Sequence, residues 1–229
     1  MNIPLNILRA GESDNCLIRL IQYIIMHMMY ERIRAKIVEC SKRMYDEHLV
    51  SATSGNVSMR IPGRDGMFAI TPSSESYSTM TADRIVIMTV DGEIIQRPDD
   101  GKPSSEWRLH AEIYRAKPEV GAIVHTHSPY ATAFAVIREP IPLILIEMQP
   151  WLGGAIPLAE YAPTGSLQLG LNAARDLGDL GGCLLANHGV VAVAPDLDLA
   201  YTRATYIEDA AKIYHMARCV GKPVEIPLN

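Results

Sequence analysis

Two histidines, His125 and His127, lie two residues apart in the run VGAIVHTH, whose β-branched residues predict a strand. Side chains two residues apart on a strand point to the same face, so both imidazoles can converge on one point. Imidazole is a common metal ligand, but two partly buried histidines held by hydrogen bonds explain such a pair equally well. The pair alone leaves a metal site and a structural role open.

Two more candidates lie far from this pair in the sequence. His188 stands in ANHG between two apolar runs, which indicates a turn, and Glu106 stands at the predicted start of a helix. Taken singly, each is more typical of a structural residue. Together the four supply three nitrogen donors and a carboxylate oxygen, a set that suits zinc or a similar divalent ion and leaves room for substrate. We therefore predict a metal site of Glu106, His125, His127 and His188.

Three short segments rich in hydroxyl and small residues accompany these candidates, at residues 54–58 (SGNVS), 71–74 (TPSS) and 102–105 (KPSS). Glycine permits close backbone approach, and hydroxyls with free N–H groups at a helix start form an anion site. Ordinary turn composition explains any one segment, but three of them beside a metal set favour a phosphate site.

The pattern of apolar residues and turn residues predicts mixed α/β structure in a single domain. Strands are expected on either side of the turn near residue 63, in a hairpin at Asp91-Gly92, in the histidine run and as a pair around His188. Helices are expected over residues 29–47, 105–117, 129–137, 164–177 and 197–220. On the second of these, His110 lies four residues after Glu106 and is expected at the helix surface or behind the ligands, not as a fifth ligand.

Composition excludes several functional classes. The 229 residues carry a formal net charge of -5 with no local cluster of lysine or arginine, which argues against nucleic-acid binding. The four cysteines form no C-x-x-C motif, and this suits a reducing cytoplasm.

The apolar run at residues 16–29 is interrupted by Arg19, Gln22 and His27 and is too short to span a membrane. We therefore expect a soluble protein with no membrane segment. Residues 1–28 are predicted to be an N-terminal extension of uncertain order that precedes a domain over residues 29–229.

The motifs S-G-N-V-S, I-T-P-S, K-P-S-S-E, H-T-H and N-H-G occur in this order over about residues 30–220. In this combination the chain resembles the class II aldolase and epimerase family, which includes adducin-like domains, and is closest in motif to its L-fuculose-phosphate aldolases. The resemblance implies a three-layer α/β/α sandwich around a largely antiparallel sheet. It also implies a homotetramer with active sites at subunit interfaces. By motif it assigns one zinc ion to Glu106, His125, His127 and His188, and the phosphate of a sugar substrate to Gly55, Asn56, Ser73, Ser74, Ser104 and Ser105.

Within this family the residue after the paired serines is glutamate in aldolases and aspartate in the epimerase. Glu106 therefore favours aldol cleavage of a ketose 1-phosphate to dihydroxyacetone phosphate and an aldehyde. In this reaction the glutamate moves a proton while zinc polarises the ketone. A 4-epimerase, a dehydratase and a decarboxylase of the same family are the alternatives. A non-catalytic adducin-like interaction module is disfavoured because such modules lack the ligand set.

Three departures from the family pattern concern the substrate. Ser73-Ser74 replaces the usual hydroxyl-glycine pair, and Ile146 stands where a catalytic tyrosine is expected. The sequence also stops at Asn229, without the tail that brings a second tyrosine to a neighbouring site. Because both tyrosines belong to the aldehyde end, we expect an aldehyde that is small or apolar there. A 5-deoxypentulose or methylthiopentulose 1-phosphate would give such a product.

Overall fold

The computed structural model describes residues 13–227 of the chain. The first part of the predicted N-terminal extension, residues 1–12, lies outside the described residues. Residues 13–28 form the beginning of helix α1 (Ser13–Asp46), which continues into the predicted domain without interruption.

Eight strands form one sheet in the order β4-β3-β2-β1-β5-β8-β7-β6. Adjacent strands pair antiparallel, except that β6 and β7 are parallel, so the largely antiparallel sheet is confirmed. The hairpin at Asp91-Gly92 and the strand pair around His188 are present. The strands are β1 (Asn56–Arg60), β2 (Met67–Ile70), β3 (Val86–Thr89), β4 (Ile94–Gln96), β5 (Ala122–Thr126), β6 (Leu158–Ala159), β7 (Gly182–Leu185) and β8 (Gly189–Ala194).

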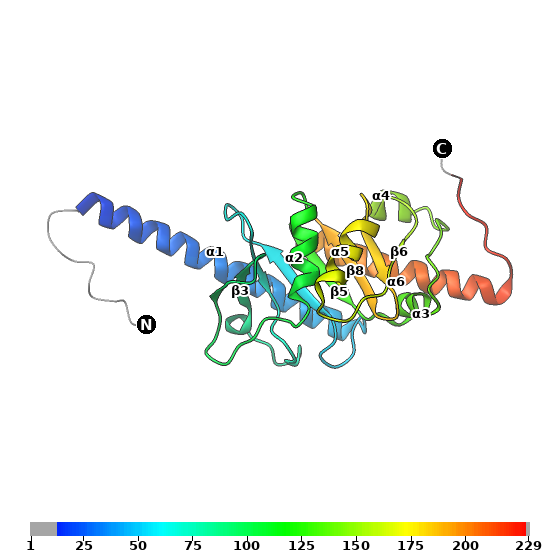
Figure 1. Ribbon diagram of the computed structural model, residues 1–229, viewed down its shortest axis with the longest axis horizontal. Helices are drawn as coiled ribbons and strands as arrows, with labels where there is room; N and C mark the ends of the chain where they lie inside the picture. Colours follow the sequence, from blue (N-terminus) through cyan, green and yellow to red (C-terminus); the bar gives the residue numbers. More distant parts are fainter. Residues whose placement is uncertain (1–12, 228–229) are drawn as a thin grey trace.

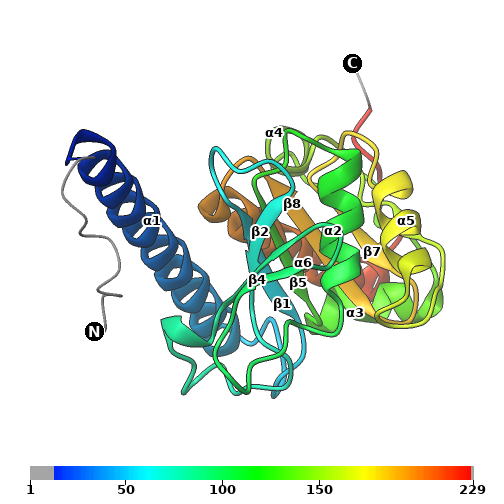
Figure 2. The same cartoon turned by 60° about the vertical axis from the view of Figure 1, so that its left-hand side comes forward.

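Helices cover both faces of this sheet, so the three-layer α/β/α sandwich is also confirmed (Figures 1 and 2). Helices α2 (Trp107–Ala116) and α5 (Leu167–Asp176) pack against each other on one face. The opposite face is covered by α1, α3 (Pro129–Ile137), α4 (Met148–Leu152) and α6 (Leu197–Val220). A short 3-10 helix, η2 (Ala82–Arg84), lies beside α1.

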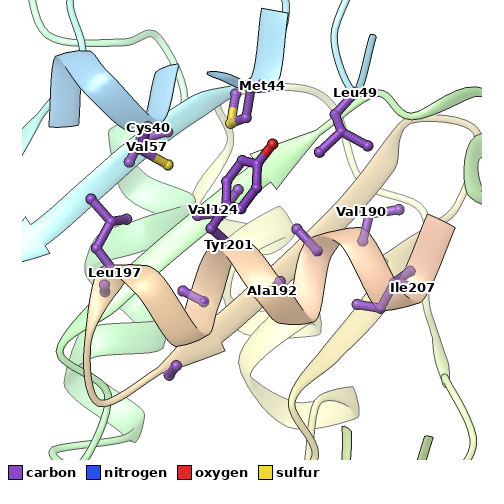
Figure 3. Packing of buried hydrophobic residues seen from close by; sticks show 14 of the residues in the cluster. Cys40, Met44, Leu49, Val57, Val124, Val190, Ala192, Leu197, Tyr201 and Ile207 are labelled. Carbon is purple, nitrogen blue, oxygen red and sulfur yellow. The ribbon is translucent and has the colours of Figure 1, made fainter. Parts of the chain in front are cut away.

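Strand residues alternate between the two cores, as a pleated sheet requires. Val124 and Val190 face the α6 side, where Tyr201 packs over them (Figure 3). Ile123 and Val191 face the α2 side. This alternation decides that His125, two residues after Ile123, points toward α2.

Helix α1 begins at Ser13, whereas the sequence pattern indicated a start at Met29. No glycine or proline interrupts residues 13–46, so nothing in the local sequence ends the helix earlier. Its first turns project from the body of the molecule (Figure 1) and expose apolar side chains. Ile18, Ile21, Ile25 and Met28 are between 47% and 66% exposed. Even so, none of the helices within residues 13–227 has the length and apolarity needed to cross a membrane.

Helix α5 begins later than the sequence indicated, at Leu167 in place of Thr164. The hydroxyl of Ser166 accepts a hydrogen bond from the N–H of Leu169 at 3.2 Å, which caps the helix. Thr164 and Gly165 are thereby left in the loop before the helix.

Candidate metal centre

The four predicted ligands come from three separate parts of the fold. His125 lies near the end of β5, and His127 follows that strand. His188 stands in the turn between β7 and β8, and Glu106 directly precedes α2. The structure brings them together, with one ligand atom from each residue lying within 4.8 Å of all the others.

The ligand atoms face one another at short range. Nε2 of His125 is 3.1 Å from Nε2 of His127 and 3.2 Å from Oε2 of Glu106. Nε2 of His188 lies 3.2 Å from Oε1 of the same carboxylate. The three imidazole rings meet edge to face, with centroids 4.9 to 5.0 Å apart. Lone pairs from all four side chains therefore point into one small volume.

The orientation of His125 is fixed from behind. Its Nδ1–H donates to the carbonyl of Val190 at 2.7 Å, across the pairing of β5 with β8. This hydrogen bond leaves Nε2 as the lone-pair atom of the neutral ring, and it is the usual way in which a metal-binding histidine is held.

One buried atom indicates that a metal ion fits here. Oε1 of Glu106 makes no hydrogen bond to any described residue, even though His188 is close. A buried carboxylate oxygen without a partner costs free energy unless a cation satisfies it. The donor set of three imidazoles and one carboxylate is also that of a divalent metal. The residues present therefore suit such an ion.

The electrostatics favour a cation at the centre. Burial raises the pKa of Glu106, but the neighbouring imidazoles of His125 and His188 outweigh it and hold that pKa below its usual value. Burial lowers the pKa of His125, and the neighbouring carboxylate outweighs it and raises the pKa above the usual value. Burial and the two other imidazoles lower the pKa of His127 to about 3. Glu106 is thus an anion, and His127 a neutral donor, at neutral pH.

Two glycines allow the backbone to approach the histidines closely. A Cβ atom on Gly189 would lie 2.3 Å from the carbonyl oxygen of Thr126 and 3.0 Å from Cδ2 of His127. Gly55 has φ of +77°, and a Cβ there would meet the carbonyl oxygen of His125 at 2.6 Å. Both positions therefore require glycine.

A cavity of about 220 Å³ opens beside the four ligands. Its wall carries hydroxyls from all three segments that the sequence singled out. Its lining residues are Thr53, Ser54, Gly55, Asn56, Pro72, Ser73, Ser74, Ser104, Ser105, Glu106, His127, Thr164 and His188.

Two of the serine segments are joined by backbone hydrogen bonds. The N–H of Ser73 donates to Lys102 at 2.9 Å, and the N–H of Ser104 donates to Thr71 at 3.0 Å. Those two N–H groups are therefore not available to a ligand. The N–H groups of Ser74 and Ser105 donate to no described residue, and both side chains are exposed. Ser74 and Ser105 thus each offer a free backbone donor to this wall.

Asn56 lies behind the carboxylate and is 2% exposed. Its Nδ2–H donates to Oε2 of Glu106 at 3.0 Å, and its Oδ1 accepts from Nε2–H of His110. His110 is fully buried, so the expectation of a helix-surface position was wrong, and the alternative of a place behind the ligands is correct.

Three further buried residues support the site, of which the sequence analysis missed Tyr77 and Tyr114 and placed Ser58 only in a predicted phosphate segment. Ser58 and Tyr114 extend the hydrogen bonding of His110, and Tyr77 donates its hydroxyl to the carbonyl of Gly55 at 2.6 Å. Residues 56 and 58 are two apart on a strand, and 106, 110 and 114 are four apart on a helix. That periodicity, with polar residues at core positions, was the available signal.

The fold agrees with comparisons to known proteins. Residues 35–215 match the family described as Class II Aldolase and Adducin N-terminal domain. The chain belongs to this family and is an enzyme of the class II aldolase type, a lyase.

Among its relatives is 5-deoxy-D-ribulose 1-phosphate aldolase of Bacillus thuringiensis serovar kurstaki. It is 34% identical over 200 residues, which cover 87% of this chain and 92% of that protein. L-fuculose phosphate aldolase of Escherichia coli K12 is 32% identical over 200 residues, covering 87% and 90% of the two chains. A solved L-fuculose 1-phosphate aldolase superposes with a TM-score of 0.81 at 33% identity, covering 86% of this chain and 91% of that chain.

Proposed function

We propose that the protein is a zinc-dependent aldolase that cleaves a ketose 1-phosphate to dihydroxyacetone phosphate and an aldehyde. The observation that carries this proposal is the convergence of four ligand atoms within 4.8 Å beside a cavity lined by serine hydroxyls. A metal centre next to an anion site is the arrangement that retro-aldol chemistry on a phosphorylated ketose needs.

Glu106, His125, His127 and His188 would hold the ion. A bound divalent ion supplies Lewis acidity that polarises the substrate ketone and stabilises the negative charge developing there. Zinc is preferred among such ions because three imidazoles and one carboxylate match its usual ligands.

Glu106 is proposed to move the proton. Its carboxylate is ionised because its pKa is held below the usual value, and it lines the cavity in which a substrate would bind. A positioned carboxylate of this kind acts as a general base and returns the proton as the product forms.

The phosphate is proposed to bind at the wall formed by residues 73–74 and 104–105, together with Gly55. The unpaired N–H groups of Ser74 and Ser105 and the nearby hydroxyls supply donors that suit a phosphate. Asn56 contributes less directly, because its amide is already bonded to Glu106 and His110. Anchoring the phosphate would place the ketone beside the histidines.

The preferred substrate is proposed to be a 5-deoxypentulose or 5-methylthiopentulose 1-phosphate. Two relatives whose names specify substrates of this kind support the proposal. They are the Bacillus protein above and 5-methylthioribulose-1-phosphate/5-deoxyribulose-1-phosphate aldolase of Rhodospirillum rubrum. The latter is 32% identical over 197 residues, or 86% of each chain. Ile146, at the position where a tyrosine was expected, is 76% exposed and is an apolar candidate for this end.

We further propose that the enzyme works in the cytoplasm as a homotetramer with active sites at subunit interfaces. The exposed apolar residues of α1 support association, because an apolar helix face of this kind is usually covered by a partner.

The test is a substrate screen on purified protein of known metal content. Ketose 1-phosphates with 5-deoxy, 5-methylthio and hydroxylated ends are compared with and without chelator, and dihydroxyacetone phosphate is measured. We expect triose-phosphate release that chelator abolishes, with preference for the deoxy or methylthio substrates. Epimerised, dehydrated or decarboxylated products without cleavage would contradict the proposal, as would preference for a hydroxyl-rich aldehyde.

A further inference from the structure

A continuous series of buried hydrogen bonds runs from Tyr114 to Glu106. Tyr114 Oη lies 2.8 Å from Ser58 Oγ, which lies 2.6 Å from Nδ1 of His110. Nε2 of His110 bonds to Oδ1 of Asn56, whose Nδ2 bonds to Glu106. We call these five residues the Tyr114–Glu106 chain.

The chain forms because a helix and a strand have nearly matching repeats. Glu106 directly precedes α2, and His110 and Tyr114 follow it at intervals of four residues on that helix, which advances about 6 Å per four residues. Asn56 and Ser58 are spaced by two residues along β1, which advances about 6.7 Å per two residues. The polar side chains of the two elements therefore interleave in the order in which they bond.

The direction of every hydrogen bond in the chain is determined by its acidic end. An ionised carboxylate only accepts, so Asn56 turns its NH2 to Glu106 and its oxygen to His110. His110 must then be protonated at Nε2, and its Nδ1 accepts from the Ser58 hydroxyl. Ser58 in turn accepts from Tyr114.

Burial supports this assignment of protons. It lowers the pKa of His110 to about 3 and raises that of Tyr114, so the imidazole is neutral and the phenol keeps its proton. All four supporting side chains are at most 2% exposed, so water does not compete for their hydrogen bonds.

We propose that Asn56, Ser58, His110 and Tyr114 are positioning residues that hold the Glu106 carboxylate turned toward the three histidines. Asn56 holds Oε2, which lies 3.2 Å from Nε2 of His125. With Oε2 held in this way, Oε1 lies 3.2 Å from Nε2 of His188 and has no hydrogen-bond partner among the described residues. The role rests on the proposed function, in which Glu106 binds the metal and moves the proton. Partners of this kind commonly change metal affinity or activity about 10- to 100-fold when removed.

The test combines His110→Phe and Tyr114→Phe with two measurements, zinc affinity by chelator competition and steady-state kinetics. We expect His110→Phe to weaken zinc binding and lower kcat by about 10-fold or more, with little change in KM. Tyr114→Phe, at the far end of the chain, is expected to have the same effects but smaller. In the Glu106→Gln background, His110→Phe should cause little further loss, because the residue acts through Glu106.

Tyr201→Phe is the matched control. Tyr201 is also a buried tyrosine with a bonded hydroxyl, to Glu47 at 2.6 Å, but it lies on the opposite face of the sheet. It should change thermal stability without changing zinc affinity or kcat. If His110→Phe fails to fold, the comparison of Tyr114→Phe with Tyr201→Phe still tests the proposal.

The outcomes separate this proposal from the proposed function. If the wild type binds zinc but cleaves no ketose phosphate, the proposed function is wrong. The zinc affinity of the variants then still tests the positioning role of the Tyr114–Glu106 chain. Variants that lose only thermal stability, with zinc affinity and kcat retained, would overturn the positioning role. Losses that add fully to that of Glu106→Gln would overturn it as well.

Discussion

Nε2 of His125 lies 3.1 Å from Nε2 of His127, and both atoms face Glu106. The Nδ1–H of His125 is committed to Val190, so its Nε2 offers a lone pair when the ring is neutral. Two imidazole nitrogens held this close, with an anionic carboxylate beside them, require either a proton or a metal ion between them.

Replacing Glu106 by glutamine keeps the shape of the side chain but removes its charge and its basicity. Activity is expected to fall ~10²-fold or more, the scale for loss of a positioned acid/base, while the fold is retained. Kinetics with circular dichroism measure both effects. Glu119→Gln, at an exposed glutamate after the same helix, is the control. Near-normal turnover by Glu106→Gln would remove this residue from the mechanism.

Zinc affinity should rise with pH. Because the pKa of His125 is raised, a proton on this ring competes with the metal up to a higher pH than a proton on an ordinary histidine would. His127, with a pKa of about 3, is already neutral over this range. Below the pKa of His125, affinity is expected to rise about tenfold per pH unit, because one proton is released per metal bound. Chelator competition between pH 5.5 and 8.5, chosen to bracket the usual histidine pKa of about 6.5, measures this. A pH-independent affinity would contradict the assignment of His125.

Gly189→Ala should disturb the site through sterics alone. The added methyl would lie 2.3 Å from the carbonyl oxygen of Thr126, so β5 and the turn must move apart. We expect weaker zinc binding and a loss of about 1–3 kcal/mol of stability, as for overpacking. Gly221→Ala meets nothing within 4 Å and should change stability by less than about 0.5 kcal/mol. Equal behaviour of the two variants would show that the close approach at Gly189 is unimportant.

The serine wall of the cavity is tested by Ser74→Ala and Ser105→Ala. If these hydroxyls bind the phosphate, each variant should raise KM by about 10-fold, since a hydrogen bond to a charged group contributes about 1.5–3 kcal/mol. Inhibition by inorganic phosphate should weaken in parallel. Ser78→Ala, an exposed serine outside the cavity, is the control. Unchanged KM and phosphate inhibition would show that these two hydroxyls do not bind the phosphate.

Much of this architecture follows from local sequence patterns. The hairpin at Asp91-Gly92 and helix α6 were predictable because turn residues and apolar spacing agree there. The start of α1 was not predictable, because residues 13–28 favour a helix and none of them ends it. The apolar residues of that segment change its exposure to solvent and do not mark a helix boundary.

The grouping of Glu106, His125, His127 and His188 was predictable, since three histidines and one glutamate suit a single metal ion. The role of His110 was not, because a histidine four residues after Glu106 fits the helix surface as well as its interior. Only the pairing of β1 with β5 decides the matter, because it places Asn56 opposite His125 and directs both toward α2. Such a contact is set by the fold and not by spacing along the chain.

The most direct test of the metal centre is the metal content of the purified protein and of two histidine variants. We predict one divalent ion per subunit in the wild type, measured by elemental mass spectrometry. His188→Ala should lose most of it, and His215→Ala, on α6 and outside the group of four ligands, should retain it. A wild type without bound metal after zinc loading, or His188→Ala with full occupancy, would contradict the account.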